Sequence, residues 1–139
     1  MAQRVVYARE QDLPAEEFGA VLDASGMGNI RPVKDSARLR DLLAGANLVV
    51  TARLDTPARP LVGVVRGLSD GAWCCYLSEV AVAPSAQKLG VGRGLIEETR
   101  RQLGPRIAVI LASVPEACGF YERIGMERIE HAFWFRRRE

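Results

Sequence analysis

The segment best suited to chemistry is a glycine-containing loop between a strand pattern and a helix pattern. Residues 87–92 are Gln-Lys-Leu-Gly-Val-Gly, and Arg93 follows directly. Gly90 and Gly92 let the backbone approach a ligand closely, and the unpaired N–H groups and positive dipole end of a helix start attract an anion. Lys88 and Arg93 add positive charge. The pattern predicts a phosphate-binding loop, although an ordinary tight turn with glycines for packing has the same spacing.

Two common phosphate motifs do not fit this loop. No Gly-Lys-Ser or Gly-Lys-Thr follows the glycines, so the loop of nucleoside-triphosphate-binding proteins is absent. The preceding strand pattern, residues 73–82, belongs to a set of antiparallel neighbours and does not open a β-α-β unit with a ribose-binding acid. The loop therefore predicts a ligand other than a nucleoside triphosphate or a dinucleotide.

The chain resembles the GNAT N-acetyltransferase superfamily at this loop and beyond it. The family signature is a strand that ends near a proline, followed by Gln/Arg-x-x-Gly-x-Gly/Ala at a helix start. Here it reads Gln87-x-x-Gly90-x-Gly92 after Pro84. The later segment 119–126, Gly-Phe-Tyr-Glu-Arg-Ile-Gly-Met, is similar to the family's Tyr-x-x-x-Gly-Phe ending. The resemblance covers nearly the whole chain.

The resemblance implies acetyl-CoA, or another acyl-CoA, as co-substrate and a primary amine, on a small molecule or a peptide, as acceptor. In the family the loop holds the pyrophosphate of coenzyme A, and the pantetheine arm lies along the preceding strand. An extended ligand with amide groups can be bound like an added strand, and a backbone N–H can stabilise the oxyanion of acyl transfer. The implied coenzyme-binding residues are Val80, Ala81, Val82, Gln87, Lys88, Leu89, Gly90, Val91, Gly92 and Arg93.

Two side chains are candidates for proton transfer. The resemblance puts Tyr121 near the thioester sulfur, where its phenol could protonate the leaving thiolate; a core-facing aromatic ring is the alternative. Glu79 is the only acid in the strand pattern 73–82, and a partly buried carboxylate there could accept a proton from the amine through water. A structural ion pair explains Glu79 at least as well.

The cysteines predict neither a metal site nor a disulfide framework. Cys74 and Cys75 are neighbours on a strand and point to opposite faces, so they do not together bind one metal ion easily. A nucleophilic pair of Cys118 and His131 has no third residue to support it. Three sparse cysteines are typical of reduced thiols, and we expect a cytoplasmic protein.

Composition excludes several other classes of protein. The 139 residues carry 19 Lys and Arg against 17 Asp and Glu, a formal charge of +2, which gives no broad field for nucleic acid. The basic run 136–138 is interpreted as a solvated tail. No apolar run has the length of a signal peptide or of a membrane span, so no membrane association is expected. One ordinary domain, residues 1–139, is predicted.

Periodicity and turn residues predict ten elements around the loop, in the order β-α-α-β-β-β-α-β-α-β. This order is typical of an α/β domain with a central mixed, mostly antiparallel sheet flanked by helices. Asp12 is the predicted cap of the first helix. The predicted strands are residues 4–8, 48–53, 61–68, 73–82, 107–111 and 128–135. The other predicted helices are residues 35–45, a helix that follows the glycine loop and ends before Gly104, and residues 115–124.

Three functions are compatible with these residues. The first is an N-acyltransferase that moves an acetyl group by direct attack of the amine in a ternary complex. The second is a non-catalytic acyl-CoA sensor or interaction module of the same fold, and the third is an unrelated phosphate-binding domain. The acceptor pocket is expected from residues 25–34 and the last strands. The aromatic run 133–135 on an edge strand predicts a homodimer.

Overall fold

Five short segments rich in apolar and β-branched residues form one mixed sheet, in the order β1-β2-β3-β4-β5. The computed structural model describes residues 3–139, so Met1 and Ala2 of the predicted domain lie outside the described residues. Neighbouring strands are antiparallel except β4 and β5, which are parallel. The strands are β1 (Val5–Arg9), β2 (Leu48–Leu54), β3 (Leu61–Ser69), β4 (Cys74–Val82) and β5 (Ala108–Leu111).

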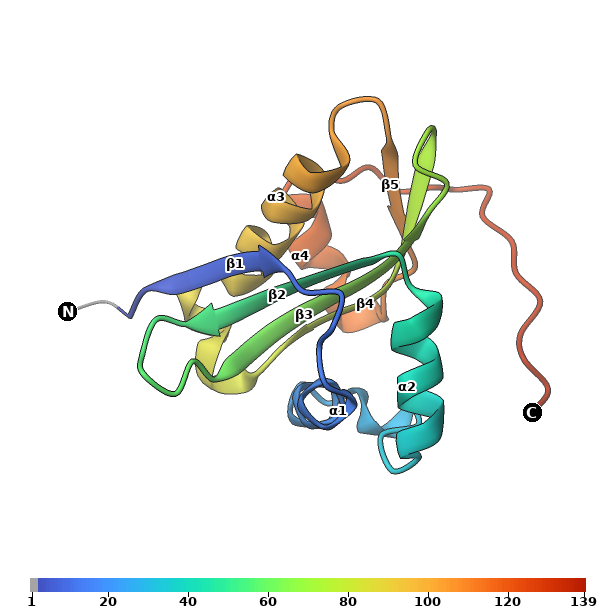
Figure 1. Cartoon of the computed structure of the whole chain (residues 1–139). Coiled ribbons are helices and arrows are strands. Elements are labelled where there is room, and N and C mark those ends of the chain that lie inside the picture. Colours follow the sequence, from blue (N-terminus) through green and yellow to red (C-terminus); the bar gives the residue numbers. More distant parts are fainter. Residues whose placement is uncertain (1–2) are drawn as a thin grey trace.

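Helices cover both faces of this sheet (Figure 1), which confirms the predicted α/β class. The helices α1 (Ala15–Ala24) and α2 (Ser36–Gly45) pack on one face, and α3 (Val91–Leu103) and α4 (Cys118–Arg123) lie on the other. Short 3-10 turns occur at Met27–Asn29, Pro84–Leu89 and Pro115–Ala117. Within residues 3–139, no helix combines the length and the apolar character that crossing a membrane requires.

The first residues of α1 and α2 are capped in different ways. The Asp35 carboxylate accepts a hydrogen bond of 3.0 Å from the backbone N–H of Arg38, as expected for an N-cap. The prediction that Asp12 caps α1 is wrong. Pro14 is the capping residue, because the first helical bond runs from the N–H of Phe18 to its carbonyl.

The sheet divides the apolar core into two clusters because successive residues of a strand face opposite sides. Val49 of β2 packs with Phe18 and Leu22 of α1. Its neighbour Val50 packs with Leu95 of α3 on the other side. Helix α3 lies close to the sheet, since a Cβ atom at Gly63 of β3 would be 2.9 Å from side-chain atoms of Val91 and of Leu95.

The prediction of a last strand over residues 128–135 is wrong. Residues 127–139, the C-terminal arm, form no helix or strand, and no backbone hydrogen bond joins them to the rest of the described chain. Aromatic residues favour a strand only where a partner strand is present. The homodimer expected from an aromatic edge strand therefore stays a prediction and needs a different structural basis.

Candidate functional site

Strand β4, which lies between β3 and β5, has a partner on its outer side along only half of its length. Residues 74–77 pair with β5, and the pairing ends at Leu77 and Leu111. On its inner side β4 stays paired with β3 as far as Val82. Within residues 3–139, the stretch 78–82 thus presents an outer edge without a strand partner, and an extended ligand can pair there.

A β-bulge separates these two halves of β4. Arg66 of β3 pairs with Glu79, but the next residue of β3, Gly67, pairs with Leu77, so Ser78 is the extra residue. The bulge reverses the facing of the side chains that follow it. As a result Val80 packs toward α3, as Leu77 does before the bulge, while Glu79 is turned to the face of α1 and α2.

The open edge exposes backbone groups of two alternate residues. The N–H of Ala83 donates to the carbonyl of Val62 on β3 at 2.8 Å. Residues of an antiparallel pair alternate between hydrogen-bonded and non-bonded positions. The register from Ala83 therefore directs the N–H and C=O groups of Val80 and Val82 away from β3. These groups point to the side where β5 has ended.

The predicted phosphate loop follows this edge directly. After the turn Pro84–Leu89, Gly90 adopts the left-handed conformation (φ 71°, ψ 24°) that favours glycine, and α3 begins at Val91. The N–H of Gly94 bonds to the carbonyl of Gly90 at 3.0 Å. The N–H groups of residues 91–93 precede that bond, so they have no partner within the helix and are available to an anion.

The side chains around the helix start fit this interpretation only in part. Residues 87–90 and Arg93 are exposed, whereas the side chain of Val91 is buried under the sheet, so Val91 can offer only its backbone. A Cβ atom at Gly92 would lie 2.9 Å from the ring of Phe120. Gly92 therefore has a packing reason as well as the proposed ligand-binding reason.

Tyr121 lies on α4, with its ring partly buried in the core under α3. Its ring meets that of Phe120 edge-on, with 5.0 Å between centroids and 73° between planes. Burial raises the pKa of Tyr121, so the phenol stays protonated at neutral pH. Within residues 3–139 the hydroxyl has no hydrogen-bond partner. The group is a proton donor without a structural bond to satisfy.

Glu79 forms a buried ion-pair cluster at the bulge, which is the alternative that the sequence left open. Its side chain is 0% exposed. Arg66 donates to both carboxylate oxygens, at 2.8 Å (Oε2) and 3.0 Å (Oε1), and Arg31 donates to Oε1 at 3.1 Å. Arg31 also donates to the carbonyl of Ser78 at 2.8 Å. The general-base role of Glu79 stays a prediction.

Arg31 and Arg66 are the site residues that the sequence did not reveal. Arg66 stands opposite Glu79 on β3, so correct pairing of the two predicted strands would have suggested it. Arg31 comes from the loop between α1 and α2, 48 positions before Glu79, and no local pattern connects the two. Through Arg31 that loop, an expected wall of the acceptor pocket, is attached to the bulge of β4.

A second charged cluster lies at the other edge of the sheet. Arg53 of β2 donates to Glu10 at 2.9 Å and to Glu17 of α1 at 2.7 Å. The hydrogen bond from Arg53 lowers the pKa of Glu10 below its usual value. A cavity is lined by these three side chains with Ala8, Ala58 and Arg59, and it contains none of the predicted site residues.

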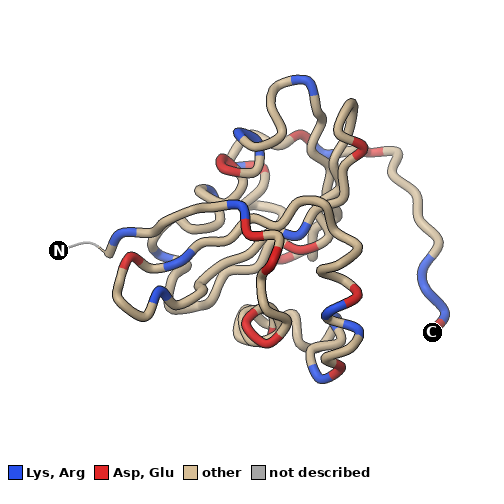
Figure 2. The backbone as a smooth tube through the Cα atoms, viewed as in Figure 1, with Lys and Arg blue, Asp and Glu red and all other residues tan. Residues whose placement is uncertain are grey.

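In the described chain the cysteines and His131 form no hydrogen bond with one another. Cys75 is buried, and its burial raises the pKa of its thiol. Cys118 begins α4, whereas His131 lies exposed in the C-terminal arm. Within residues 3–139 no group of His, Cys, Asp and Glu is arranged to hold a metal ion. Figure 2 shows acidic and basic residues interspersed over the body of the molecule, without a continuous basic face in this view.

Comparison with known proteins gives consistent matches. The acetyltransferase (GNAT) domain family matches residues 29–136. GCN5-related N-acetyltransferase 1, chloroplastic, of Arabidopsis thaliana is 26% identical over 117 residues, which is 83% of this chain but only 57% of that protein. The chain thus spans a little over half the length of this curated relative.

Solved structures share the fold over almost the full chain. An acetyltransferase structure from Deinococcus radiodurans R1 has a TM-score of 0.74 and 27% identity, covering 99% of this chain and 94% of that chain. The aminoglycoside N-acetyltransferase AAC(6')-Iy, solved in complex with CoA, has a TM-score of 0.71 and 18% identity, covering 99% and 97%. At such low identity the second match shows the fold alone.

Proposed function

Because the chain belongs to the acetyltransferase (GNAT) domain family, we propose that it transfers the acetyl group of acetyl-CoA to a primary amine. One observation carries the proposal: the open edge of β4 continues without interruption into the helix start at Gly90. An extended thioester ligand with a phosphate-bearing end needs both features in this order. The family uses acyl-CoA. An acceptor that appears in a relative's name is a substrate of that relative and is not assigned to this chain.

The backbone supplies most of the proposed binding. The N–H groups of residues 91–93 bind the pyrophosphate, and Lys88 and Arg93 contribute positive charge. The C=O group of Val80 and the N–H and C=O groups of Val82 pair with the amides of the pantetheine arm as a neighbouring strand would, which leaves the N–H of Val80 for the thioester oxygen. Side-chain identity therefore matters less here than the φ angle at Gly90 and the bulge before Glu79.

The reaction follows from this arrangement. The amine nitrogen attacks the carbonyl carbon of the thioester, and the N–H of Val80 stabilises the negative charge that forms on the oxygen. The C–S bond then breaks, and the Tyr121 hydroxyl gives its proton to the departing thiolate. Solvent returns a proton to Tyr121 and accepts the one that the new amide nitrogen loses.

For Glu79 we favour the ion-pair role. Three arginine hydrogen bonds hold its carboxylate, and the side chain has no exposure to solvent. A proton can reach such a group only if the cluster opens. The same observation favours a second candidate function, an acyl-CoA sensor, since it leaves the described site without an evident base. The cytoplasmic location inferred from the cysteines also remains a prediction.

A thiol-release assay tests the proposal and separates the candidates. The full chain is mixed with acetyl-CoA and a panel of amines: a polyamine, an amino acid, an aminoglycoside and a peptide with a free N-terminus. Catalytic release of free thiol with one of them, and none with its N-acetylated form, is expected. Binding of acetyl-CoA without release across the panel would favour the sensor, and absence of binding would contradict both.

A further inference from the structure

The ion-pair cluster at the bulge of β4 carries more positive than negative charge. Arg31 and Arg66 both bond to Glu79, and within residues 3–139 neither guanidinium group forms a salt bridge with another acid. Arg66 and Glu79 neutralise each other, because Arg66 donates to both carboxylate oxygens. The cluster therefore keeps one positive charge in excess, and this charge lies on Arg31.

The guanidinium group of Arg31 is only partly used. Its Nε donates to Glu79 at 3.1 Å, its Nη1 to the carbonyl of Ile30 at 3.0 Å and its Nη2 to the carbonyl of Ser78 at 2.8 Å. A guanidinium group has five N–H donors, so two of them have no acceptor within the described chain. The side chain of Arg31 is 25% exposed, against 8% for Arg66. Arg31 can thus bind an anion that arrives from solvent.

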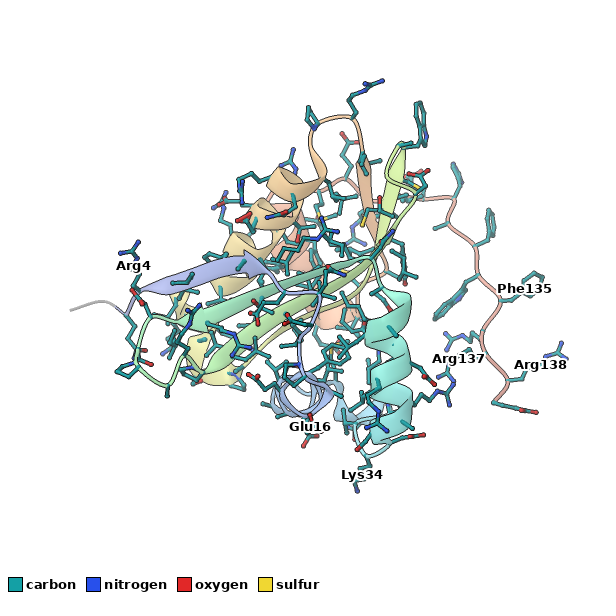
Figure 3. The ribbon with its side chains drawn as sticks, viewed as in Figure 1. Arg4, Glu16, Lys34, Phe135, Arg137 and Arg138 are labelled. Atoms are coloured by element: carbon teal, nitrogen blue, oxygen red, sulfur yellow. The ribbon has the colours of Figure 1, made fainter. Side chains whose placement is uncertain are left out.

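The charge of Arg31 is directed at β4. Arg31 and Lys34 are the two cations of the loop between α1 and α2. Lys34 is exposed, and its side chain extends away from the body of the molecule (Figure 3). Arg31 is held against the strand by its hydrogen bond to the Ser78 carbonyl. An anion bound to Arg31 would therefore lie beside the strand that, in the proposed function, carries the thioester.

This is also the side from which an acceptor reaches the thioester. In the proposed function the pyrophosphate lies at the start of α3 and Tyr121 approaches the sulfur from α4, so both are on the face that these helices cover. The face of α1 and α2, toward which Glu79 and Arg31 are turned, is left for the amine. Ser78 precedes Val80 by two residues, so its carbonyl lies roughly 7 Å along the strand from the proposed oxyanion donor.

We propose that Arg31 selects an acceptor amine that bears a carboxylate a few bonds away, such as a free amino acid. The carboxylate accepts hydrogen bonds from the two free N–H groups of Arg31 and balances the excess charge of the cluster, while the amine lies at the thioester. The inference rests on the proposed function, because it assigns an acceptor to that site. The bonds made and broken are those of the proposed acyl transfer, and Arg31 determines which amine is held.

Matched acceptors test this selection. Thiol release from acetyl-CoA is measured with a panel of amino acids, with the α-amide of each, and with the amine that remains when the carboxyl group is removed. The wild-type chain should use at least one amino acid with a kcat/KM roughly tenfold to a hundredfold above that of its amide and of its decarboxylated amine, because the charge-assisted bonds to Arg31 are lost with the carboxylate. Thiol release that favours the neutral amines would overturn the inference and leave the proposed function intact.

Variants of Arg31 separate recognition of the acceptor from support of the loop. Arg31→Gln should raise the KM of the preferred amino acid roughly tenfold to a hundredfold and hardly change the KM of its amide. Arg31→Lys keeps the charge and should restore part of the preference. Arg40→Gln, the same change at an exposed arginine of α2, should have no effect on either KM. Equal increases for the amino acid and its amide in Arg31→Gln would show a structural role only and overturn the selection.

Binding of the product tests the same contact without turnover. With coenzyme A present, calorimetry should show that the wild-type chain binds the N-acetylated form of at least one amino acid roughly tenfold to a hundredfold more tightly than the N-acetylated amide, and Arg31→Gln should remove this difference. If no amine releases thiol but the difference is found, the proposed transfer fails and the carboxylate site stands. Equal binding of the two compounds across the panel would overturn the carboxylate site, whether or not thiol is released.

Discussion

The two halves of β4 belong to one continuous strand but differ in what lies on their outer side. Residues 74–77 pair with β5, and their outward backbone groups are used within the sheet. Residues 78–82 follow the bulge and have no outer strand within the described chain. The first half stabilises the fold, whereas in our proposal the second offers backbone groups to a ligand. A binding edge can thus arise inside a sheet wherever a partner strand ends.

A cluster of charged side chains lies at the bulge that separates the two halves. Glu79, Arg66 and Arg31 connect β4, β3 and the loop between α1 and α2 at the bulge itself. The cluster of Arg53 at the sheet edge uses similar groups, but its acids are partly exposed, with 25% for Glu10 and 39% for Glu17. Only the first cluster lies where the strand changes its role, which makes the second a suitable control.

Removing the boundary cluster should have the largest effect. Glu79→Ala leaves two arginines without their carboxylate in a buried place, and loss of one partner of a buried ion pair typically costs about 3–5 kcal/mol of unfolding free energy. Denaturant unfolding measures this loss. Glu10→Ala, in the partly exposed cluster, should cost clearly less, and equal losses would show that the bulge cluster has no special structural role.

The same position separates the two roles of Glu79. Glu79→Gln should lower stability and keep kcat in the folded fraction if the carboxylate only anchors the bulge. If Glu79 is the general base, kcat should fall at every pH below the range in which the free amine predominates.

The open half of β4 can be tested through its backbone. In Val80→Pro the lost N–H is not part of the ladder with β3, so the protein should fold and kcat should fall by about 10²–10³, the usual effect of losing one oxyanion donor. Ala81→Pro should instead lose a ladder bond to β3 and be destabilised. Stopped-flow or steady-state kinetics with melting curves measure both, and a folded Val80→Pro protein with full kcat would contradict the oxyanion role.

Tyr121 lies outside β4 but acts, in this account, on the thioester held along its open half. Tyr121→Phe keeps the ring and removes the hydroxyl, so kcat should fall roughly tenfold to a thousandfold while acetyl-CoA affinity hardly changes. The melting temperature should also stay unchanged, because no hydrogen bond to the hydroxyl is present within residues 3–139. Full kcat in the variant would return Tyr121 to a purely structural role.

The smallest expected effect belongs to the edge cluster that serves as control. Arg53 lowers the folded-state pKa of Glu10, so this carboxylate stabilises the fold above its unfolded pKa of about 4.3, and the contribution is lost as pH falls through the folded pKa. Glu10→Gln should therefore lose less stability than wild type between about pH 5 and pH 3. Thermal unfolding in that range measures this. Acetyl-CoA affinity at neutral pH should not change, since Glu10 is remote from β4.

The sequence predicted those parts of the fold that depend on local patterns. The loop from Gln87 to Gly92, the helix after it and the strands β2 to β4 lie where glycine, proline and β-branched residues indicated. The sequence could also foresee that Glu79 has an ionic partner. It could not identify Arg31, because the contact depends on how a distant loop packs on the bulge.

The predicted strand over residues 128–135 was wrong for a different physical reason. Strand propensity in Phe133 and its neighbours describes a segment that is suited to a sheet but does not supply the partner strand. The close approach of Phe120 to Gly92 is a comparable case, because the sequence offered packing as an alternative at the glycine but could not name the partner segment. In both cases the missing information lies in the other segment.

The most direct test of the central claim is an amide NMR titration of the full chain with acetyl-CoA. The account predicts saturable shifts at Val80, at Val82 and in the first turn of α3, residues 91–93, with little change at Glu10 and Arg53 on the far edge of the sheet. Absence of binding, or saturable shifts at that edge with none along the open half of β4, would contradict it.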